Sequence, residues 1–474
     1  MYCLFYERGV RLLKEGGQLS YITSNKWMRA GYGEKLRNLF AKDVAVEEVI
    51  DFGGVVVFSA AVVDTAIVQL SKRKPGDSFP AVVLTREFSL QGSLTQYMLD
   101  NAVPFQNPGD GIDAWVVISP ERYRIKQKVE AQGVPLGRWH IQISYGVKTG
   151  YNEAFYLTAD ERQELIDAHP SSAELIKPLL RGRFIERYGT NWDDSYQIIA
   201  KFGAHEYLEQ DFPAIFKHLS KHRKALEKRG QCTYSRQSKA GAGKAYPGQH
   251  HWLELDNNPD DRYLGLFEQP KIIYPNMTKY LPFYLDTAEH FFTNDKAFIL
   301  TTEGESLPYL VAVLNSALFR CCFMDNFPNL GEDRRELRKI FMDKVPIKKP
   351  ADAAQTALFE ALVPLVQAAK AQAQSSDDRA YALAGNFLTE VIDACVMELY
   401  FPQHMAERNL SITAAVRTLL PANAADMNQA EQAAAALTFY RTANESSHPI
   451  RNILLRIPAD SPDLLAVIQR EGAV

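Results

Sequence analysis

The sequence has few cysteines, no long apolar run and no secretory leader. No two cysteines form a C-x-x-C pair, which excludes the common zinc-finger spacings and predicts that the chain holds no metal. The apolar start MYCLFYERGVRLL is interrupted by Glu7 and Arg8 and lacks the charged head and cleavage site of a leader. These absences predict a protein of the reducing cytoplasm with no membrane partner. The five cysteines are Cys3, Cys232, Cys321, Cys322 and Cys395.

An overall excess of positive charge is also missing. The net charge is −4 over 474 residues, which argues against a simple polyanion-binding protein. The distribution is uneven, because the stretch 217–244 (KHLSKHRKALEKRGQCTYSRQSKAGAGK) carries nine Lys or Arg and the single acid Glu227. This stretch is either a solvated helix face with a loop or a surface that contacts phosphates.

The first 75 residues alternate between helical and strand patterns. A helix in which Tyr2, Phe5, Gly9 and Leu12 share one face precedes the strand QLSYITS; a second helix then leads to the strands VEEVIDF and DTAIVQLSK. Such alternation is typical of α/β proteins with mainly parallel sheets, whereas two strands joined by a short loop must be antiparallel. The pattern therefore predicts a partial doubly wound sheet with an antiparallel last strand.

The remaining chain changes pattern twice, which indicates several domains. Residues 76–120 are rich in Gly, Pro, Asp and Ser and read as a connecting segment with one or two strands. Residues 121–350 mix short strands with amphipathic helices, which predicts an α+β domain. Residues 351–474 predict a helical tail, in which the alanine-rich stretch 421–437 is a linker or a marginal helix.

One aromatic residue, Phe58, stands between two predicted strands and is followed at once by small residues. A core hairpin would normally carry Asn-Gly or Asp-Gly at its turn. Phe58 is therefore either a core aromatic at a strand end, or a ring with little bulk around it that admits a flat ligand.

Several blocks, in order, resemble one enzyme family. LFYERGVRLLKEGGQLSYITSNKWMRAGYGEKLR and EEVIDFGGVVVFSAAVVDTAIVQLSK resemble the back half of the catalytic domain of adenine-specific DNA methyltransferases. The subgroup is that of TaqI methylase and the fused type IIG restriction–modification enzymes. GVKTGYNEAFYL, IKPLLRGRFIERYG and EQPKIIYPNM are similar to its target recognition domain, and NFLTEVIDACVMELY to a helix that often closes it. The resemblance covers roughly residues 1–400.

The resemblance implies a methyl donor, S-adenosylmethionine, and an acceptor, the exocyclic amine of a flipped adenine. Flipping is required because a stacked and paired base cannot reach the donor. Phe58 matches the family position whose ring stacks on that adenine, and the small Ser59, Ala60 and Ala61 would let the sugar approach.

The segment Asn25, Lys26 and Trp27 follows the first predicted strand at its carboxyl end, where ligands of doubly wound sheets bind. The resemblance places it beside the target-base pocket, with Lys26 on a phosphate and Trp27 stacking or packing. The alternative is that the segment caps the next helix and fills a crevice.

Two family motifs are missing, the Gly-containing donor loop and the Asn-Pro-Pro-Tyr catalytic turn. NNPDD (257–261) lacks the second Pro and the Tyr, and GAGKAYPG (241–248) does not follow an apolar strand. The chain is therefore expected to be inactive alone and to need an upstream methyltransferase half, in the same or a separate chain.

The second block of the resemblance supplies candidate DNA contacts. Lys148 and Thr149 lie between glycines, in a phosphate-contacting loop or a simple tight turn, and Asn152 is suited to an adenine edge. Arg181 and Arg183 suit guanines or phosphates, although an ion pair with Glu186 or an aspartate is the alternative. Lys201, at the end of the strand YQIIAK, is a further candidate.

The aromatic stretch 274–284 (YPNMTKYLPFY) lies downstream of these candidates and is expected to build core rather than to touch DNA.

The leading hypothesis is the C-terminal portion of a site-specific adenine DNA methyltransferase of a restriction–modification or phage-defence system, with double-stranded DNA as partner. The first alternative is the matching part of a fused type IIG restriction endonuclease–methyltransferase. The second is a non-catalytic, sequence-specific DNA-binding specificity subunit.

Overall fold

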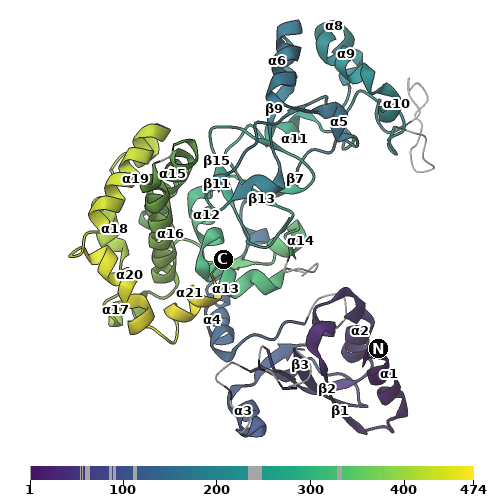
Figure 1. Ribbon diagram of the computed structural model, residues 1–474, viewed down its shortest axis with the longest axis vertical. Coiled ribbons are helices and arrows are strands. Elements are labelled where there is room, and N and C mark those ends of the chain that lie inside the picture. Colours follow the sequence, from purple (N-terminus) through teal and green to yellow (C-terminus); the bar gives the residue numbers. More distant parts are fainter. Residues whose placement is uncertain are drawn as a thin grey trace.

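Figure 1 shows an N-terminal sheet with its helices, a central mixed region, and helices that pack against one side of it. This computed structural model describes residues 2–53, 55, 57–58, 64–84, 88, 92–109, 115–232, 248–327, 334–376 and 378–473. The mixed sheets and many helices agree with the expected combination of α/β, α+β and helical parts.

The N-terminal sheet has the strand order β1-β3-β2-β4-β5. β3 runs antiparallel to both β1 and β2, as expected for β2 and β3, while β4 is parallel to β2 and β5 antiparallel to β4. The prediction of a mainly parallel sheet is wrong, because β3 returns between β1 and β2 and separates the two strands that share a direction. The strands are β1 (Gln18–Ser24), β2 (Ala45–Asp51), β3 (Thr65–Ser71), β4 (Ser78–Val83) and β5 (Val103–Gln106).

Helices cover both faces of this sheet. α1 (Tyr2–Leu12) and α2 (Glu34–Lys42) pack on the face that carries Val49, and α3 (Leu94–Asn101) packs on the face that carries Ile50. α1 buries Tyr6 and Val10 and leaves Phe5 and Leu12 exposed. The predicted face is therefore only partly right, because Tyr2 and Gly9 lie against the core and β1 while Phe5 and Leu12 point away.

Two four-stranded sheets form the centre of the molecule, with the strand orders β16-β9-β12-β8 and β15-β13-β17-β7. Three two-stranded ribbons accompany them: β10-β11, β14-β18 and β19-β6. The strands are β6 (Val134–Pro135), β7 (Ile141–Tyr145), β8 (Tyr156–Leu157), β9 (Ile176–Leu180), β10 (Ile185–Glu186), β11 (Gly189–Thr190), β12 (Tyr196–Ile198), β13 (Lys271–Pro275), β14 (Met277–Thr278), β15 (Tyr284–Asp286), β16 (Phe292–Thr293), β17 (Ala297–Thr302), β18 (Arg335–Glu336) and β19 (Pro346–Ile347).

Short helices join and cover these central sheets, as expected for an α+β region. They are α4 (Pro120–Glu130), α5 (Asn152–Phe155), α6 (Ala159–Ala168), α7 (Ser172–Leu175), α8 (Leu208–Asp211), α9 (Pro213–Lys221), α10 (Arg223–Leu226), α11 (Asp261–Gly265), α12 (Leu307–Asn315), α13 (Ala317–Phe323) and α14 (Lys339–Met342).

The C-terminal segment is helical, as predicted. From Gln429 onward the alanine-rich stretch is a true helix, because Asn428 and Glu431 form a capping box at the start of α19, which buries Ala433 and Ala436. α16 is long and apolar enough to cross a membrane, but half of its apolar window is buried within the structure, as in core helices. The helices are α15 (Ala353–Ser375), α16 (Arg379–Tyr400), α17 (Pro402–Glu407), α18 (Thr413–Leu419), α19 (Gln429–Ala443), α20 (Pro449–Asp460) and α21 (Leu465–Glu471).

Candidate base pocket and nucleic-acid interface

The ends of β1 and β2 are tied together by a buried pair of polar side chains. The Asn25 amide nitrogen donates to Asp51 Oδ1 at 2.8 Å, and the backbone nitrogen of Gly53 donates to the same oxygen at 2.9 Å. Arg29 Nη2 lies 3.9 Å from Asp51 Oδ2. Asn25 is therefore a structural partner of the second loop, and Asp51, which the sequence motifs did not single out, holds both loops at one edge of the sheet.

The other two residues of the segment have different surroundings. Lys26 is exposed, while Trp27 has no exposed surface and packs edge-on against Phe40, with ring centroids 5.1 Å apart. Ser24 caps the short 3₁₀ helix of this segment through the nitrogen of Lys26. The structure therefore favours the packing alternative for Trp27 and leaves Lys26 accessible.

Phe58 lies in the loop between β2 and β3 with 46% of its surface exposed. Val55 and Val57 pack inward against the core under this loop, so the exposed ring is not the one that anchors it. The core alternative for Phe58 does not hold. The small residues Ser59, Ala60 and Ala61 lie outside the described residues.

Two predicted DNA-contact motifs meet at one turn, Thr293–Lys296. After β7, the backbone nitrogen of Val147 donates to the carbonyl oxygen of Thr293 in this turn (2.7 Å). The backbone nitrogen of Gly146 donates to the carbonyl oxygen of Ala297, the residue directly after the turn (3.0 Å). A Cβ atom at Gly146 would overlap the carbonyl oxygens of Thr293 and Asn294. Only glycine fits there, because no side chain can occupy so close a backbone approach.

The second motif approaches the same turn from β9. A Cβ atom at Gly182 would lie 2.8 Å from the carbonyl oxygen of Lys296. The next residue, Arg183, is exposed and its guanidinium stacks 4.6 Å from the centroid of the Phe184 ring. No carboxylate of the described residues lies within ion-pair distance of Arg183, whereas Arg181 pairs with Asp193. The ion-pair alternative thus holds for Arg181 and not for Arg183.

The turn brings a further cation to the two motifs. Lys148 is exposed with its ammonium 5.5 Å from the centroid of the exposed Tyr145 ring, and Lys296 is exposed beside Asp295 at 3.4 Å. We call Tyr145, Lys148, Arg183 and Lys296 the turn surface. Sequence reasoning missed Lys296 and Tyr145, since neither stands in a motif and only the fold joins them to Lys148 and Arg183.

The rest of the first motif has a local role. Thr149 is buried, and its hydroxyl donates to Asn152 Oδ1 at 2.6 Å. Thr149 is therefore not placed to touch a phosphate in this conformation; it orients Asn152, which is exposed at the start of α5. Of this motif, Lys148 and Asn152 are accessible.

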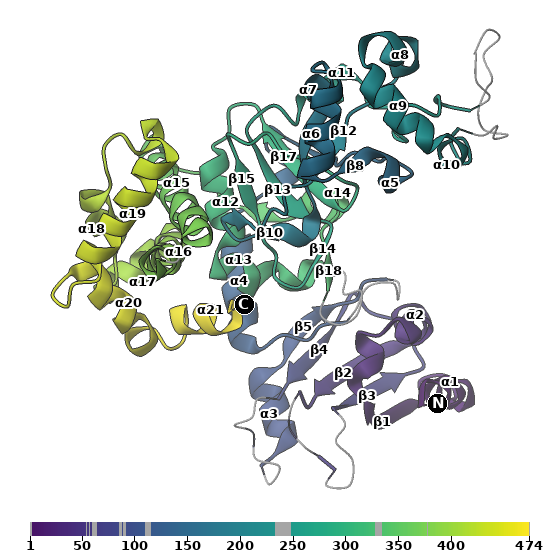
Figure 2. The ribbon, with the colours of Figure 1, turned by 45° about the horizontal axis from the view of Figure 1, so that its top comes forward.

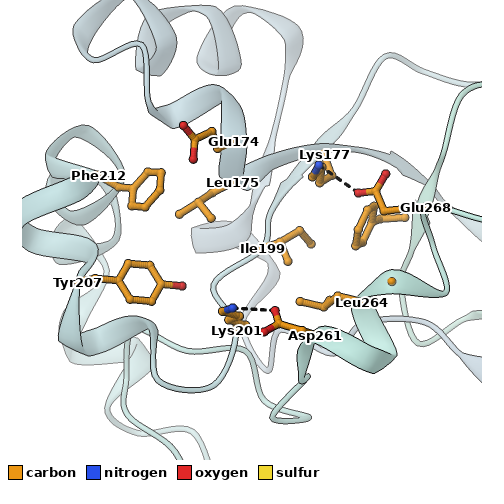
Figure 3. A pocket seen from close by; sticks show the side chains of 12 residues that line it. Glu174, Leu175, Lys177, Ile199, Lys201, Tyr207, Phe212, Asp261, Leu264 and Glu268 are labelled. Carbon is orange, nitrogen blue, oxygen red and sulfur yellow. Dashed lines mark hydrogen bonds and ion pairs between the residues drawn. The ribbon is translucent and has the colours of Figure 1, made fainter.

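Lys201 belongs to a separate site. It forms an ion pair with Asp261 at 2.6 Å on the rim of a pocket of about 460 Å³, which Figure 3 shows. The pairing with Asp261 raises the pKa of Lys201 and keeps it charged. Lys177 and Glu268 pair at 3.1 Å on one side of the pocket. The apolar part of the lining includes Leu175, Ile199 and Leu264.

The described part of the basic stretch is mainly exposed, which fits both a solvated face and a phosphate-contacting surface. Lys217, Lys221, Lys224 and Lys228 are exposed on α9, α10 and the turn after them. Arg229 is buried instead and donates to the carbonyl oxygens of Thr149, of Trp252 (2.8 Å) and of Glu254 (2.7 Å). Residues 233–244 of the stretch lie outside the described residues.

Comparison with known families and proteins matches two segments of the chain. The Eco57I restriction-modification methylase family matches residues 1–58, and the TaqI-like C-terminal specificity domain matches residues 177–347. These matches confirm the resemblance that the sequence blocks indicated.

The related proteins are type II enzymes. Type II methyltransferase M.BstVI of Geobacillus stearothermophilus is 21% identical over 369 residues, which cover 74% of this chain and 61% of that protein. Type II methyltransferase M.PaeR7I of Pseudomonas aeruginosa is 24% identical over 33% of this chain and 29% of its own length. Type II restriction enzyme and methyltransferase RM.Eco57I of Escherichia coli is 27% identical over 34% of this chain and 16% of its own. The chain thus spans at most 61% of these relatives.

Among solved structures, the type IIL restriction-modification enzyme MmeI in complex with DNA matches with a TM-score of 0.43 and 13% identity, over 100% of this chain and 52% of MmeI. The type IIG restriction endonuclease BpuSI matches with a TM-score of 0.39 and 13% identity, over 75% of this chain and 43% of BpuSI.

The close approach at Gly146 makes a testable prediction. Gly146→Ala should destabilise the central region by about 1–3 kcal/mol, because the added methyl overlaps a backbone that cannot move without breaking the turn. Thermal unfolding measures the change. Gly189→Ala is the matched control, since its Cβ would meet nothing closer than 3.9 Å. Equal melting temperatures for the two variants would contradict this account of the turn.

Proposed function

We propose that this chain, a relative of the TaqI-like and Eco57I-type restriction–modification methyltransferases, is the C-terminal portion of a site-specific adenine DNA methyltransferase. It would act in the cytoplasm in restriction–modification or phage defence. The observation that carries the proposal is the order of a methylase segment and a specificity domain in one chain. The methyltransferase relatives imply S-adenosylmethionine as the methyl donor.

We assign residues 1–75 to the back half of the catalytic domain, 76–120 to a connection, 121–350 to target recognition and 351–474 to a helical tail. β4 and β5 come from the connection and extend the N-terminal sheet.

The base pocket of this proposal lies at the edge where β1 and β2 end. Phe58 offers an exposed ring, and the Asn25–Asp51 pair fixes the two loops that border it. Stacking of a base on an aromatic ring is worth about 1–3 kcal/mol, which offsets part of the cost of flipping. Phe58 is the residue that we expect to touch the flipped adenine.

The turn surface is the proposed grip on the duplex. Lys148, Arg183 and Lys296 place three exposed cations around one rigid turn, and the neighbouring acids among the described residues include Asp295 beside Lys296 and Asp256 near Lys148. Lysines suit phosphates, while the uncommitted guanidinium of Arg183 suits either a phosphate or the paired acceptors of guanine. Asn152 would lie beside them.

The proposed partner is an upstream methyltransferase half, in the same or a separate chain. Support comes from α1, whose outer face exposes Leu4, Phe5 and Leu12, the last at 68%. β1, at the sheet edge beside α1, has neither Pro nor charge, whereas the opposite edge strand β5 contains Pro104. Proteins normally protect a free strand edge with proline or charged residues. Because β1 has neither, its edge is the side of the sheet suited to a partner.

Two other readings stay open as proposals. RM.Eco57I combines a restriction enzyme with a methyltransferase, which favours a fused type IIG enzyme as the second candidate. A non-catalytic specificity subunit is the third. The DNA directly upstream separates them, because an encoded Asn-Pro-Pro-Tyr turn there, in frame or in an adjacent gene, supports the first two, and its absence supports the third.

The proposal makes a prediction about binding of the methyl donor. The isolated chain should show no measurable S-adenosylmethionine binding in calorimetry, because its sequence contains neither the donor loop nor the catalytic turn. Circular dichroism of the same sample serves as the control for folding. Micromolar binding would contradict the assignment of the donor site to another segment.

The second prediction concerns duplex DNA. Affinity should fall steeply with salt, because phosphate contacts release counterions. Lys148→Gln and Lys296→Gln should each reduce the slope of log K against log salt by about 1. Lys74→Gln, at an exposed lysine of the N-terminal region, should leave it unchanged. A slope insensitive to both turn-surface variants would remove this surface from the interface.

The third prediction tests the flipped base in the enzyme reconstituted with its upstream half. Phe58→Ala should lower methylation of a paired duplex by about tenfold, since stacking energy is lost, and lower methylation of a duplex with a mismatched target adenine less. Phe202→Ala, at another exposed phenylalanine, is the control. Equal losses on both substrates would refute the stacking role.

A further inference from the structure

A cavity of about 500 Å³ lies where the central region meets the C-terminal helices. Its lining comes from the hairpin β10–β11 and from α13, α15, α16 and α21. Figure 2 shows α21 next to α13, with α15 and α16 beside them. The described lining residues include three cations, Arg187, Arg320 and Lys370, and two carboxylates, Asp393 and Glu390. None of these five residues belongs to the base pocket or to the turn surface.

The two arginines of the cavity share one acceptor. Arg187 Nη2 and Arg320 Nη1 both donate to the carbonyl oxygen of Asn315, at 2.6 and 2.7 Å. Two guanidinium groups that bind one oxygen lie close enough to repel each other. Burial, and next the charge of Arg187, lower the pKa of Arg320 to about 10. The fold therefore holds two like charges together at the wall of the cavity.

A single buried carboxylate compensates for these charges only in part. Asp393 Oδ2 lies 3.7 Å from Arg187 Nη2, and Asp393 Oδ1 accepts the backbone N–H of Ala317 at 2.9 Å. Arg320 has only 4% of its surface exposed, and its Nε donates to Gly472 O at 2.7 Å. Its Nη2 atom has no hydrogen-bond partner among the described residues. A buried cation is costly unless an anion is paired with it, and no described carboxylate lies within ion-pair distance of Arg320.

Lys370 of α15 brings the third cation to the cavity. Its ammonium donates to the carbonyl oxygen of Arg187 at 2.8 Å and lies 5.9 Å from the centroid of the Tyr188 ring. An ammonium has three N–H groups, so this bond leaves two of them for other acceptors. Burial, and next the charge of Arg187, lower the pKa of Lys370 to about 8. The lysine is therefore a further cation that the surrounding described residues do not neutralise.

We propose that this cavity binds a small oxyanion of the phosphate type, either free or as the phosphate group of a small molecule, between Arg187, Arg320 and Lys370. Hydrogen bonds from guanidinium and ammonium groups to such an anion are charge-assisted and strong. The anion would supply the counter-charge that Asp393 provides only in part. The cavity is within the size range of small-molecule sites, so there is room for more than the anion itself.

The position of the cavity gives the occupant a structural consequence. Arg187 belongs to the hairpin β10–β11 of the central region, Arg320 to α13, and Lys370 to α15 of the helical tail. An anion held by all three would tie the tail to the central region. This inference does not depend on the proposed methyltransferase function.

Calorimetric titration of the full chain with sodium sulfate tests the site. Lys370→Met should weaken sulfate binding by about tenfold or more, because one of three charged donors is lost. Glu390→Gln should strengthen sulfate binding severalfold, since it removes the negative charge of an exposed residue of the lining. Lys221→Met, at an exposed lysine of α9 outside the cavity, is the matched control and should bind as the wild type does. Inorganic phosphate should compete with sulfate for the same site.

The pH dependence of sulfate binding separates a ligand-binding role of Lys370 from a structural one. Between about pH 7 and pH 9 the affinity of the wild type should fall by about tenfold, because a lysine whose pKa is about 8 loses its charge in that interval. Lys370→Met should show no such fall, although it retains every other charged or titratable group around the ammonium. These groups are Glu186, Arg187 and Tyr188 of the hairpin, Arg320 of α13, and Glu390 and Asp393 of α16.

Absence of sulfate binding by the wild type, or equal binding by the wild type and Lys370→Met, overturns the proposal. Should Lys370→Met fail to fold, as judged by circular dichroism, Glu390→Gln decides, because an unchanged affinity in that variant also overturns it. Duplex DNA is the other source of phosphate. An unchanged salt slope of DNA binding in Lys370→Met supports a small anion as the occupant, whereas a slope reduced by about 1 assigns the site to DNA and overturns the small-anion proposal.

Discussion

The contact of two glycines with the turn Thr293–Lys296 holds the candidate DNA-binding surface together. Gly146 and Gly182 come from different strands, and each lies against a carbonyl oxygen of this turn. Because the contacts are made by backbone, the side chains of Lys148 and Arg183 are left free to face solvent, while Val147 is buried. Lys148 and Arg183 therefore extend from a rigid base, which lowers the entropy lost when they bind a partner. Asn276, between β13 and β14, donates its N–H to Lys296 O at 2.8 Å, so the orientation of β14–β18 depends on the same turn.

Local structure could be predicted from the sequence because it depends on periodicity. The strands β1 and β3, and the presence of a helix between β1 and β2, agree with their patterns. The order of the strands could not be predicted, since insertion of β3 between β1 and β2 depends on contacts between distant segments. The buried face of α1 was predicted only in part, because the helix has apolar residues on two sides and only the sheet decides which side packs.

The candidate site shows the same division. Motifs indicated Phe58, Lys148 and Arg183, which the structure leaves exposed. They could not show that Trp27 fills the core or that Thr149 is turned toward Asn152, because both depend on neighbours from other elements. Asp51 and Lys296 stand in no motif that distinguishes them from other charged residues. Their roles depend on contacts with residues from other elements, and a single sequence does not show which distant residues are in contact.

The contrast between the two edges of the N-terminal sheet has a consequence for the cell. β5 ends the sheet with a proline, while β1 ends it with seven residues that carry no charge, next to an apolar helix surface. A strand of that kind is a template for unwanted pairing, and chaperones and proteases act on such surfaces. In the proposed assembly with a separate upstream half, production of this chain alone would therefore be limited by quality control, and synthesis of the two proposed parts in balance would be required.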